Sequence, residues 1–100
     1  MINHTVLFKV QDFDTPKDKQ DALLEIKESL MGLDGKIEQL KHIEVQLHHT
    51  LNSDSFDLAL ITHFNTLADV DIYQVHPLHL EVVKVVKKYA VGRACVDFEF

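Results

Sequence analysis

Two imidazoles, those of His76 and His79, and the phenol of Tyr73 lie within one short segment of otherwise apolar sequence. A third imidazole, that of His4, stands near the N-terminus among apolar residues. Histidine exchanges its proton near neutral pH and can serve as a general base. A tyrosine hydroxyl can donate a hydrogen bond to an oxyanion that develops on a carbonyl. Together these groups suit the abstraction of a proton next to a carbonyl, as in an aldol reaction.

Each of these residues also has an ordinary structural explanation. His76 precedes a proline and suits a helix cap, whereas Tyr73 and His79 could simply hold a helix to a sheet through hydrogen bonds. His4 could be a hydrogen-bonded strand residue, and Asp97 near the C-terminus could be solvated or paired with a lysine. Whether these side chains come together in one site therefore depends on the strands and helices that carry them.

Alternating apolar residues predict a first strand over residues 2–10. One face of this strand carries His4, Val6, Phe8 and Val10. A helix should follow from Pro16 to about Leu33, because Thr15 suits the N-cap and proline suits the first turn. Gly32 and Gly35 stand where that helix should stop.

Two further strands, over residues 37–50 and 56–65, surround a polar turn and should form a hairpin. Thr66 suits the cap of a short helix that runs to about Tyr73. Pro77 should start the next helix, which places His79 in its first turn, where the positive end of the helix dipole keeps an imidazole neutral. We expect Gly92 to end this helix and residues 93–100 to form the last strand.

The order β-α-β-β-α-β predicts an α+β, ferredoxin-like fold with an antiparallel sheet and both helices on one face. This topology places the last strand, with Asp97, beside the first, where His4 lies. An apolar pocket is expected between sheet and helices, and the residues predicted to line it are Val6, Phe8, Leu23, Ile26, Leu60, Val82 and Val83. The opposite sheet face carries Leu7, Ile61, Val96 and Phe98, which a second subunit would cover, so we expect a homodimer.

Length and composition narrow the class of protein. The chain has 100 residues, so residues 1–100 are expected to form one domain. Its formal charge of −6 argues against binding nucleic acid or an anionic membrane. The single cysteine cannot form an internal disulfide and is typical of a reducing, cytoplasmic location. We expect neither a signal peptide nor a membrane span, since no apolar run approaches about 20 residues.

Four segments resemble the stress-responsive A/B barrel (Dabb) family, whose members are dimeric α+β barrels. The matching segments are residues 4–9, 56–60, 73–79 and 96–98. The resemblance implies that two ferredoxin-like subunits pack their sheets face to face into one barrel. By comparison with the plant olivetolic acid cyclase, a distantly similar member, it also implies roles for individual residues. His79 matches the general base, Tyr73 the phenol that polarises the carbonyl, and Asp97 the carboxylate that supports the histidine, with His4 as the fourth residue of the site.

Two functions from different classes stay open. The first is a pocket for a small apolar, phenolic or polyketide-like molecule, with cofactor-independent cyclase or lyase acid–base chemistry by His79 and Tyr73. The alternative is a non-catalytic, stress-responsive structural protein whose function lies in its assembly. A haem-degrading monooxygenase, found on the same fold in other families, is not favoured because no resemblance reaches the motifs of those families.

No cofactor or metal is expected from residue spacing. His42 and His48 share a strand face but lie roughly 20 Å apart at the rise of a strand, and His48 and His49 point to opposite faces. Cys95 stands mid-strand beside apolar residues, where thiols are usually inert. Some members of the Dabb family bind magnesium through backbone oxygens at positions that correspond to residues 32–37 here. Because side chains do not reveal such a site, magnesium binding by this chain stays open.

Overall fold

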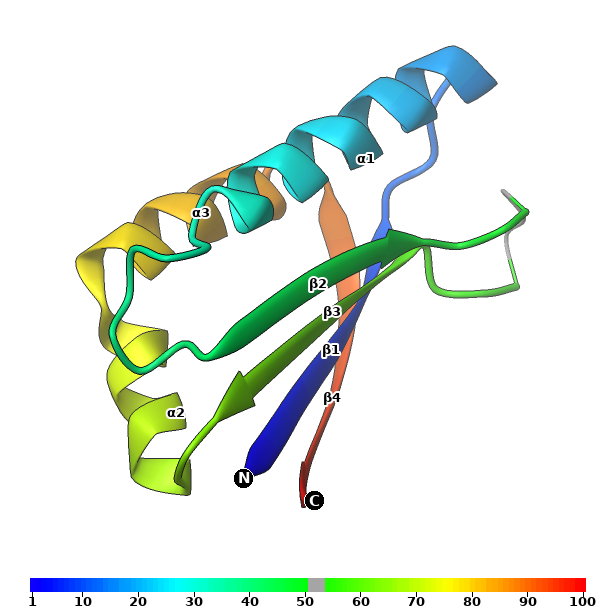
Figure 1. Cartoon of the computed structure of the whole chain (residues 1–100). Helices are drawn as coiled ribbons and strands as arrows, with labels where there is room; N and C mark the ends of the chain where they lie inside the picture. Colours follow the sequence, from blue (N-terminus) through cyan, green and yellow to red (C-terminus); the bar gives the residue numbers. More distant parts are fainter. Residues whose placement is uncertain (51–53) are drawn as a thin grey trace.

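The computed structural model describes residues 1–50 and 54–100, and within these residues four strands form one antiparallel sheet in the order β2-β3-β1-β4 (Figure 1). The strands are β1 (Ile2–Val10), β2 (His42–Leu47), β3 (Leu58–Phe64) and β4 (Ala90–Glu99). The helices α1 (Pro16–Met31), α2 (Leu67–Val75) and α3 (Pro77–Lys87) lie on one side of the sheet. This arrangement confirms the predicted ferredoxin-like fold.

The central strand β1 pairs with β3 on one side and with β4 on the other. His4 therefore stands opposite Thr62 of β3 and opposite Asp97 of β4. The predicted inward face of β1 is confirmed, because its residues from His4 to Val10 alternate between buried and half-buried. The buried row packs under the helices, with Leu23 and Ile26 of α1 in the same core.

Short polar side chains cap the helices where the sequence predicts caps. The Thr15 hydroxyl accepts a hydrogen bond from the backbone amide of Asp18 at 3.1 Å, and the Thr66 hydroxyl accepts one from the backbone amide of Asp69 at 3.1 Å. At the α2–α3 junction, Nδ1 of His76 accepts the amide of Leu78 at 3.1 Å. The predicted capping role of His76 is therefore confirmed, and Tyr73 and His79 lie on either side of this corner.

Some predicted boundaries are wrong. The helix α3 ends at Lys87 rather than at Gly92, because the backbone from Ala90 onward pairs with β1. Gly92 lies within β4 opposite Lys9, and an added Cβ there would stand 3.3 Å from the Lys9 Cβ. Strand β2 begins at His42, since residues 37–41 form an irregular link whose apolar side chains Ile37 and Leu40 are buried in the core.

The sheet face away from the helices keeps an apolar surface. Leu7 and Ile61 are half-buried there, while the side chains of Val96 and Phe98 are 55% and 45% exposed. Apolar surface gathered on one side of a small protein usually contacts another molecule. None of the helices in the described part of the chain has the length and apolar character that crossing a bilayer requires.

A buried carboxylate, that of Asp57, ties β1 to the start of α1. Asp57 is 1% exposed and accepts the amide of Val10 at 2.8 Å, while the ammonium of Lys19 lies 2.9 Å from its other oxygen. Its own backbone amide donates to the carbonyl of Phe8. Buried carboxylates require such partners, because an unpaired charge inside a protein is strongly destabilising.

Replacement of Asp57 by asparagine should lower the free energy of unfolding by about 2–3 kcal/mol, because it removes the buried charge that pairs with Lys19. Urea denaturation followed by circular dichroism measures this change. Asp14→Asn, at an exposed loop position, is the control and should stay within about 0.5 kcal/mol of the wild type. Equal stability of the two variants would contradict a structural role for the Asp57 charge.

Candidate pocket between α3 and the sheet

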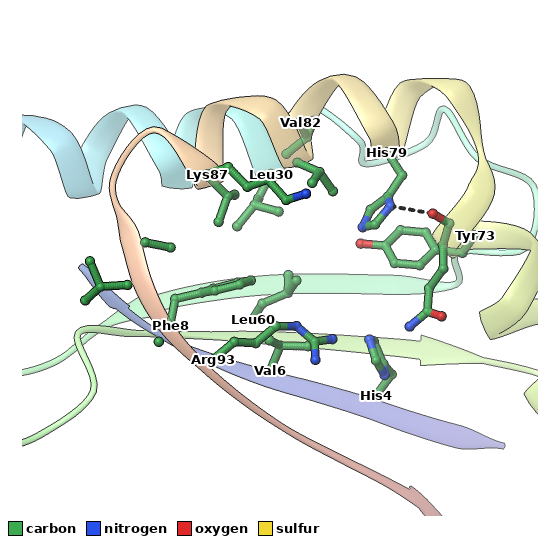
Figure 2. A pocket seen from close by; sticks show the side chains of 16 residues that line it. His4, Val6, Phe8, Leu30, Leu60, Tyr73, His79, Val82, Lys87 and Arg93 are labelled. Atoms are coloured by element: carbon green, nitrogen blue, oxygen red, sulfur yellow. Dashed lines mark hydrogen bonds between the residues drawn. The ribbon is translucent and has the colours of Figure 1, made fainter. Parts of the chain in front are cut away.

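A pocket of about 440 Å³ lies between α3 and the helix-facing side of the sheet (Figure 2). This volume falls in the range of small-molecule sites. Most of the lining is aliphatic or aromatic, and the polar side chains stand toward the α2–α3 junction and along α3 and β4. The lining residues are His4, Val6, Phe8, Leu30, Leu60, Tyr73, Gln74, His79, Val82, Val83, Val86, Lys87, Ala90, Val91, Gly92 and Arg93.

The expected apolar lining is found in part. Val6, Phe8, Leu60, Val82 and Val83 line the pocket. Leu23 and Ile26 do not, which corrects the sequence-based expectation, because both side chains are fully buried in the core between α1 and the sheet. The α1 residue that reaches the pocket is Leu30, near the end of that helix.

Tyr73 stands in the last turn of α2 and points its hydroxyl into the pocket (Figure 2). The side chain is 1% exposed, and no described residue forms a hydrogen bond with its hydroxyl. Its ring packs against Phe64 at 5.0 Å and against His79 at 4.4 Å between ring centroids. Burial raises the pKa of Tyr73 to about 12, so the phenol is neutral at physiological pH and keeps its proton to donate.

His79 lies in the first turn of α3 with its Nδ1 3.0 Å from the backbone carbonyl of Gln74. A carbonyl only accepts hydrogen bonds, so Nδ1 carries the proton and Nε2 of the neutral ring is left as a base. Burial lowers the pKa of His79 despite the Gln74 bond, which acts to raise it. Coulombic interactions with His4, Arg93 and His76 lower the pKa of His79 further.

His4 and Asp97 form a pair across β1 and β4. Nδ1 of the buried His4 ring is hydrogen-bonded to the Asp97 carboxylate, and the two residues stand directly opposite each other in the sheet. The resemblance implied that Asp97 supports His79, but its partner is His4, since His79 uses a backbone carbonyl instead. His4 lines the pocket with its ring centroid 6.5 Å from that of Tyr73, whereas Asp97 does not line it.

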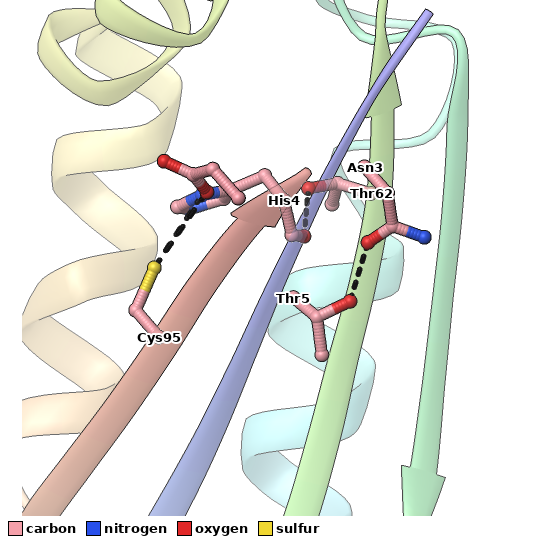
Figure 3. A network of polar contacts seen from close by, with 6 residues as sticks. Asn3, His4, Thr5, Thr62 and Cys95 are labelled. Atoms are coloured by element: carbon pink, nitrogen blue, oxygen red, sulfur yellow. Dashed lines mark hydrogen bonds and ion pairs between the residues drawn. The ribbon is translucent and has the colours of Figure 1, made fainter. Parts of the chain in front are cut away.

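Cys95 and Asp97 lie on the same face of β4, and Cys95 points toward the ring of His4 on β1 (Figure 3). Its sulfur lies 3.6 Å from Nδ1 of His4 and 3.7 Å from Oδ1 of Asp97. Burial and the Asp97 charge raise the pKa of the Cys95 thiol. The protonated thiol is therefore a poor nucleophile, as its sequence position predicted.

Two cationic side chains of the pocket were missed by reasoning from the sequence. Lys87 approaches from α3 and Arg93 from β4, on opposite sides of the cavity (Figure 2). Among the described residues that line the pocket, none is acidic, although the whole chain carries a formal charge of −6. The signal was present for Arg93, because the predicted last strand begins there and Arg93 shares the alternation of Cys95 and Asp97.

Comparison with known proteins identifies the family. The Stress responsive A/B Barrel Domain, Dabb, matches residues 2–100. The chain belongs to this family. A solved structure of a dimeric protein of unknown function and ferredoxin-like fold from Bacteroides fragilis matches with 34% sequence identity and a TM-score of 0.88, and the match covers 99% of this chain and 95% of that one.

Two plant proteins extend the Dabb comparison. A stress-response A/B barrel domain-containing protein of Arabidopsis thaliana, DABB1, is 28% identical over 87 residues, which are 84% of this chain and 40% of that protein. The present chain thus spans less than half the length of this relative. A hydroxynitrile lyase from Passiflora edulis has a TM-score of 0.74 at 16% identity, covering 97% of this chain and 90% of the lyase, and this likeness establishes the fold alone.

Substitution of Tyr73 by phenylalanine should leave the free energy of unfolding unchanged or raise it by about 1 kcal/mol, because a buried hydroxyl without a protein partner is removed. Tyr89→Phe is the matched control. It loses the 2.9 Å bond to Glu25 and should lower stability by about 0.5–1 kcal/mol. Urea denaturation at neutral pH measures both, and a clear loss of stability in Tyr73→Phe would show that its hydroxyl is bonded within the protein.

The raised pKa of Tyr73 also predicts a pH dependence. Above pH 10 the unfolded chain ionises this tyrosine, whereas the folded chain keeps it neutral up to about 12. The contribution of Tyr73 to the free energy of unfolding is fully present below pH 10 and is lost as the pH rises toward 12. Stability should therefore fall less steeply over this interval in Tyr73→Phe than in the wild type, and identical slopes would contradict the burial of the phenol.

Proposed function

We propose that the pocket binds a small, largely apolar molecule with a carbonyl or phenolic oxygen, such as a phenolic acid or a polyketide-like chain. The observation that carries this proposal is the Tyr73 hydroxyl, which is buried, aimed into the pocket and without a described protein partner. Buried polar groups nearly always find a partner. A ligand oxygen that accepts from Tyr73 would supply one.

The neutral forms of Tyr73 and His79 suit acid–base chemistry on such a ligand. Tyr73 keeps its proton because burial raises its pKa to about 12, and it can donate to a carbonyl oxygen. His79 has a lowered pKa and presents Nε2 as an unprotonated base. A donor and a base whose rings lie 4.4 Å apart can therefore act on one carbonyl and on the carbon beside it.

The reaction we propose is an intramolecular aldol-type ring closure without a cofactor. Nε2 of His79 takes a proton from the carbon next to a carbonyl, and the electron pair moves onto the carbonyl oxygen that Tyr73 holds. The enolate carbon then attacks a second carbonyl of the same molecule and forms a carbon–carbon bond. The new alkoxide takes the proton back from His79, so atoms and charge balance.

The cations at the pocket support an anionic end on the ligand. Lys87 and Arg93 line the pocket, and no described lining residue offsets their charge. Carboxylates are bound well by guanidinium and ammonium groups. The apolar body would lie against Val82, Val83 and Leu60 while the carboxylate faces the two cations.

Binding can be tested with two probes that differ by one carboxylate group, 2,4-dihydroxybenzoate and resorcinol, by calorimetry and thermal shift. Tyr73→Phe should weaken both by about threefold to tenfold, the usual value of one hydrogen bond. Lys87→Gln should weaken only the acid, by about twofold to fivefold, because the cation is exposed.

Lys84→Gln is the matched control for Lys87→Gln. Lys84 lies on the same helix, pairs with Glu81 at 3.1 Å and does not line the pocket, so its loss should leave both affinities unchanged. Binding that is equal in the wild type, Tyr73→Phe and Lys87→Gln would contradict the proposed site. Absence of binding by either probe would favour the assembly function instead.

We also propose a homodimer in which two copies cover the outer sheet face. The exposed side chains of Val96 and Phe98 on that face support this assembly, as do dimeric solved structures of related sequence. Two sheets packed face to face would bury this apolar surface. The pocket would remain on the opposite, helix-covered side of each sheet.

Phe98→Glu should convert the dimer to a monomer, because a buried charge in the interface has no partner. Ile72→Glu is the control, since Ile72 of α2 is equally exposed at 45% but lies on a helix. Sedimentation velocity measures both variants at the same protein concentration. A wild-type monomer, or a dimer that survives Phe98→Glu, would contradict this interface.

A further inference from the structure

We propose that His4, Cys95 and Asp97 form a binding site for one transition metal ion of the zinc class. The three side chains come from opposite ends of the chain and meet on the helix-facing side of the β1–β4 pair. Spacing along the sequence could not suggest this site, because its first ligand precedes the others by almost the whole chain.

The geometry is that of a preformed group of ligands. Nδ1 of His4, Sγ of Cys95 and a carboxylate oxygen of Asp97 all lie within 4.8 Å of one another. Zinc ligands at about 2.0–2.3 Å from the ion stand at comparable separations in tetrahedral sites. The strands hold all three, since His4 is paired with Asp97 across the sheet and Cys95 lies two residues away on the same face.

The chemistry of the donors selects the ion. A mixed set of imidazole nitrogen, thiolate sulfur and carboxylate oxygen suits zinc and cobalt, whereas magnesium and calcium prefer oxygen alone. Three protein ligands leave a fourth, open position, as in zinc sites that bind water or a substrate. Cys95 and Asp97 are exposed, so an ion can enter from solvent.

Metal binding would replace the hydrogen bond that now joins His4 to Asp97. The ion displaces the proton of the thiol, which leaves to solvent, and the neutral imidazole binds the ion through Nδ1 with the ring proton on Nε2. One thiolate and one carboxylate then neutralise a divalent charge. The Arg93 guanidinium acts near Cys95, and its positive charge opposes the ion.

The site stands beside the pocket without being part of its acid–base pair. His4 lines the pocket, but Cys95 and Asp97 do not, and neither Tyr73 nor His79 belongs to the ligand group. Metal binding and ligand turnover can therefore be tested separately. A failure to bind metal would not affect the proposed ligand binding by Tyr73 and His79, and the reverse also holds.

Titration of the metal-free protein with Co²⁺ tests the proposal, because thiolate-bound cobalt gives a strong near-ultraviolet charge-transfer absorption. The chain contains one cysteine, so any such band reports Cys95. We expect saturation at one Co²⁺ per chain, loss of the band on adding Zn²⁺, and no loss on adding Mg²⁺. Cys95→Ser should abolish the band.

Asp97→Ala distinguishes the three-ligand site from binding by the thiol alone and should weaken Co²⁺ affinity by at least about tenfold. Glu99→Ala is its matched control, because Glu99 is an exposed carboxylate on the same strand, two residues away and outside the ligand group. Circular dichroism verifies that each variant folds. No band in the wild type, or equal Co²⁺ affinity in Asp97→Ala and Glu99→Ala, would overturn the proposal.

Discussion

The antiparallel pairing of β1 with β4 is the constraint on which the pocket and its polar neighbours depend. It joins the first and last segments of the chain and sets Phe8 opposite Arg93 and His4 opposite Asp97. A shift of this register by one residue would turn Arg93 and Asp97 to the other face of the sheet. The Arg93 cation at the pocket and the carboxylate beside His4 are therefore consequences of a single backbone alignment.

The corner between α2 and α3 supplies the other half of the pocket. His76 caps α3 through the amide of Leu78, and Pro77 begins the helix, so the chain turns sharply between Tyr73 and His79. That turn brings the phenol and the imidazole into ring contact at 4.4 Å. Burial raises the pKa of the phenol and lowers the pKa of the imidazole, so the phenol stays protonated and the imidazole stays neutral.

Most of the fold, but less of the site, could be predicted from the sequence. Alternation and capping residues such as Thr15 and Thr66 identified strand faces and helix starts, since those signals are local. Gly92 was misassigned because its role is a close approach to Lys9 across the sheet, which is invisible along the chain. The same limit applies to Asp57, whose burial depends on Val10 and Lys19. The predicted topology did place Asp97 beside the strand of His4, and only the family resemblance assigned it to His79.

The two ends of the described fold are hydrogen-bonded to each other. The amino group of Met1 donates to the carbonyl of Phe100 at 3.2 Å, and the amide of Phe100 donates to the carbonyl of Met1 at 3.0 Å. Both ends emerge side by side at the lower end of the sheet, to the right of α2 in Figure 1. Adjacent ends let a domain be inserted into another protein, or joined in tandem, through short connections. Because the two ends lie side by side, a fusion partner would occupy nearly the same position whether it were joined to the first or to the last residue described.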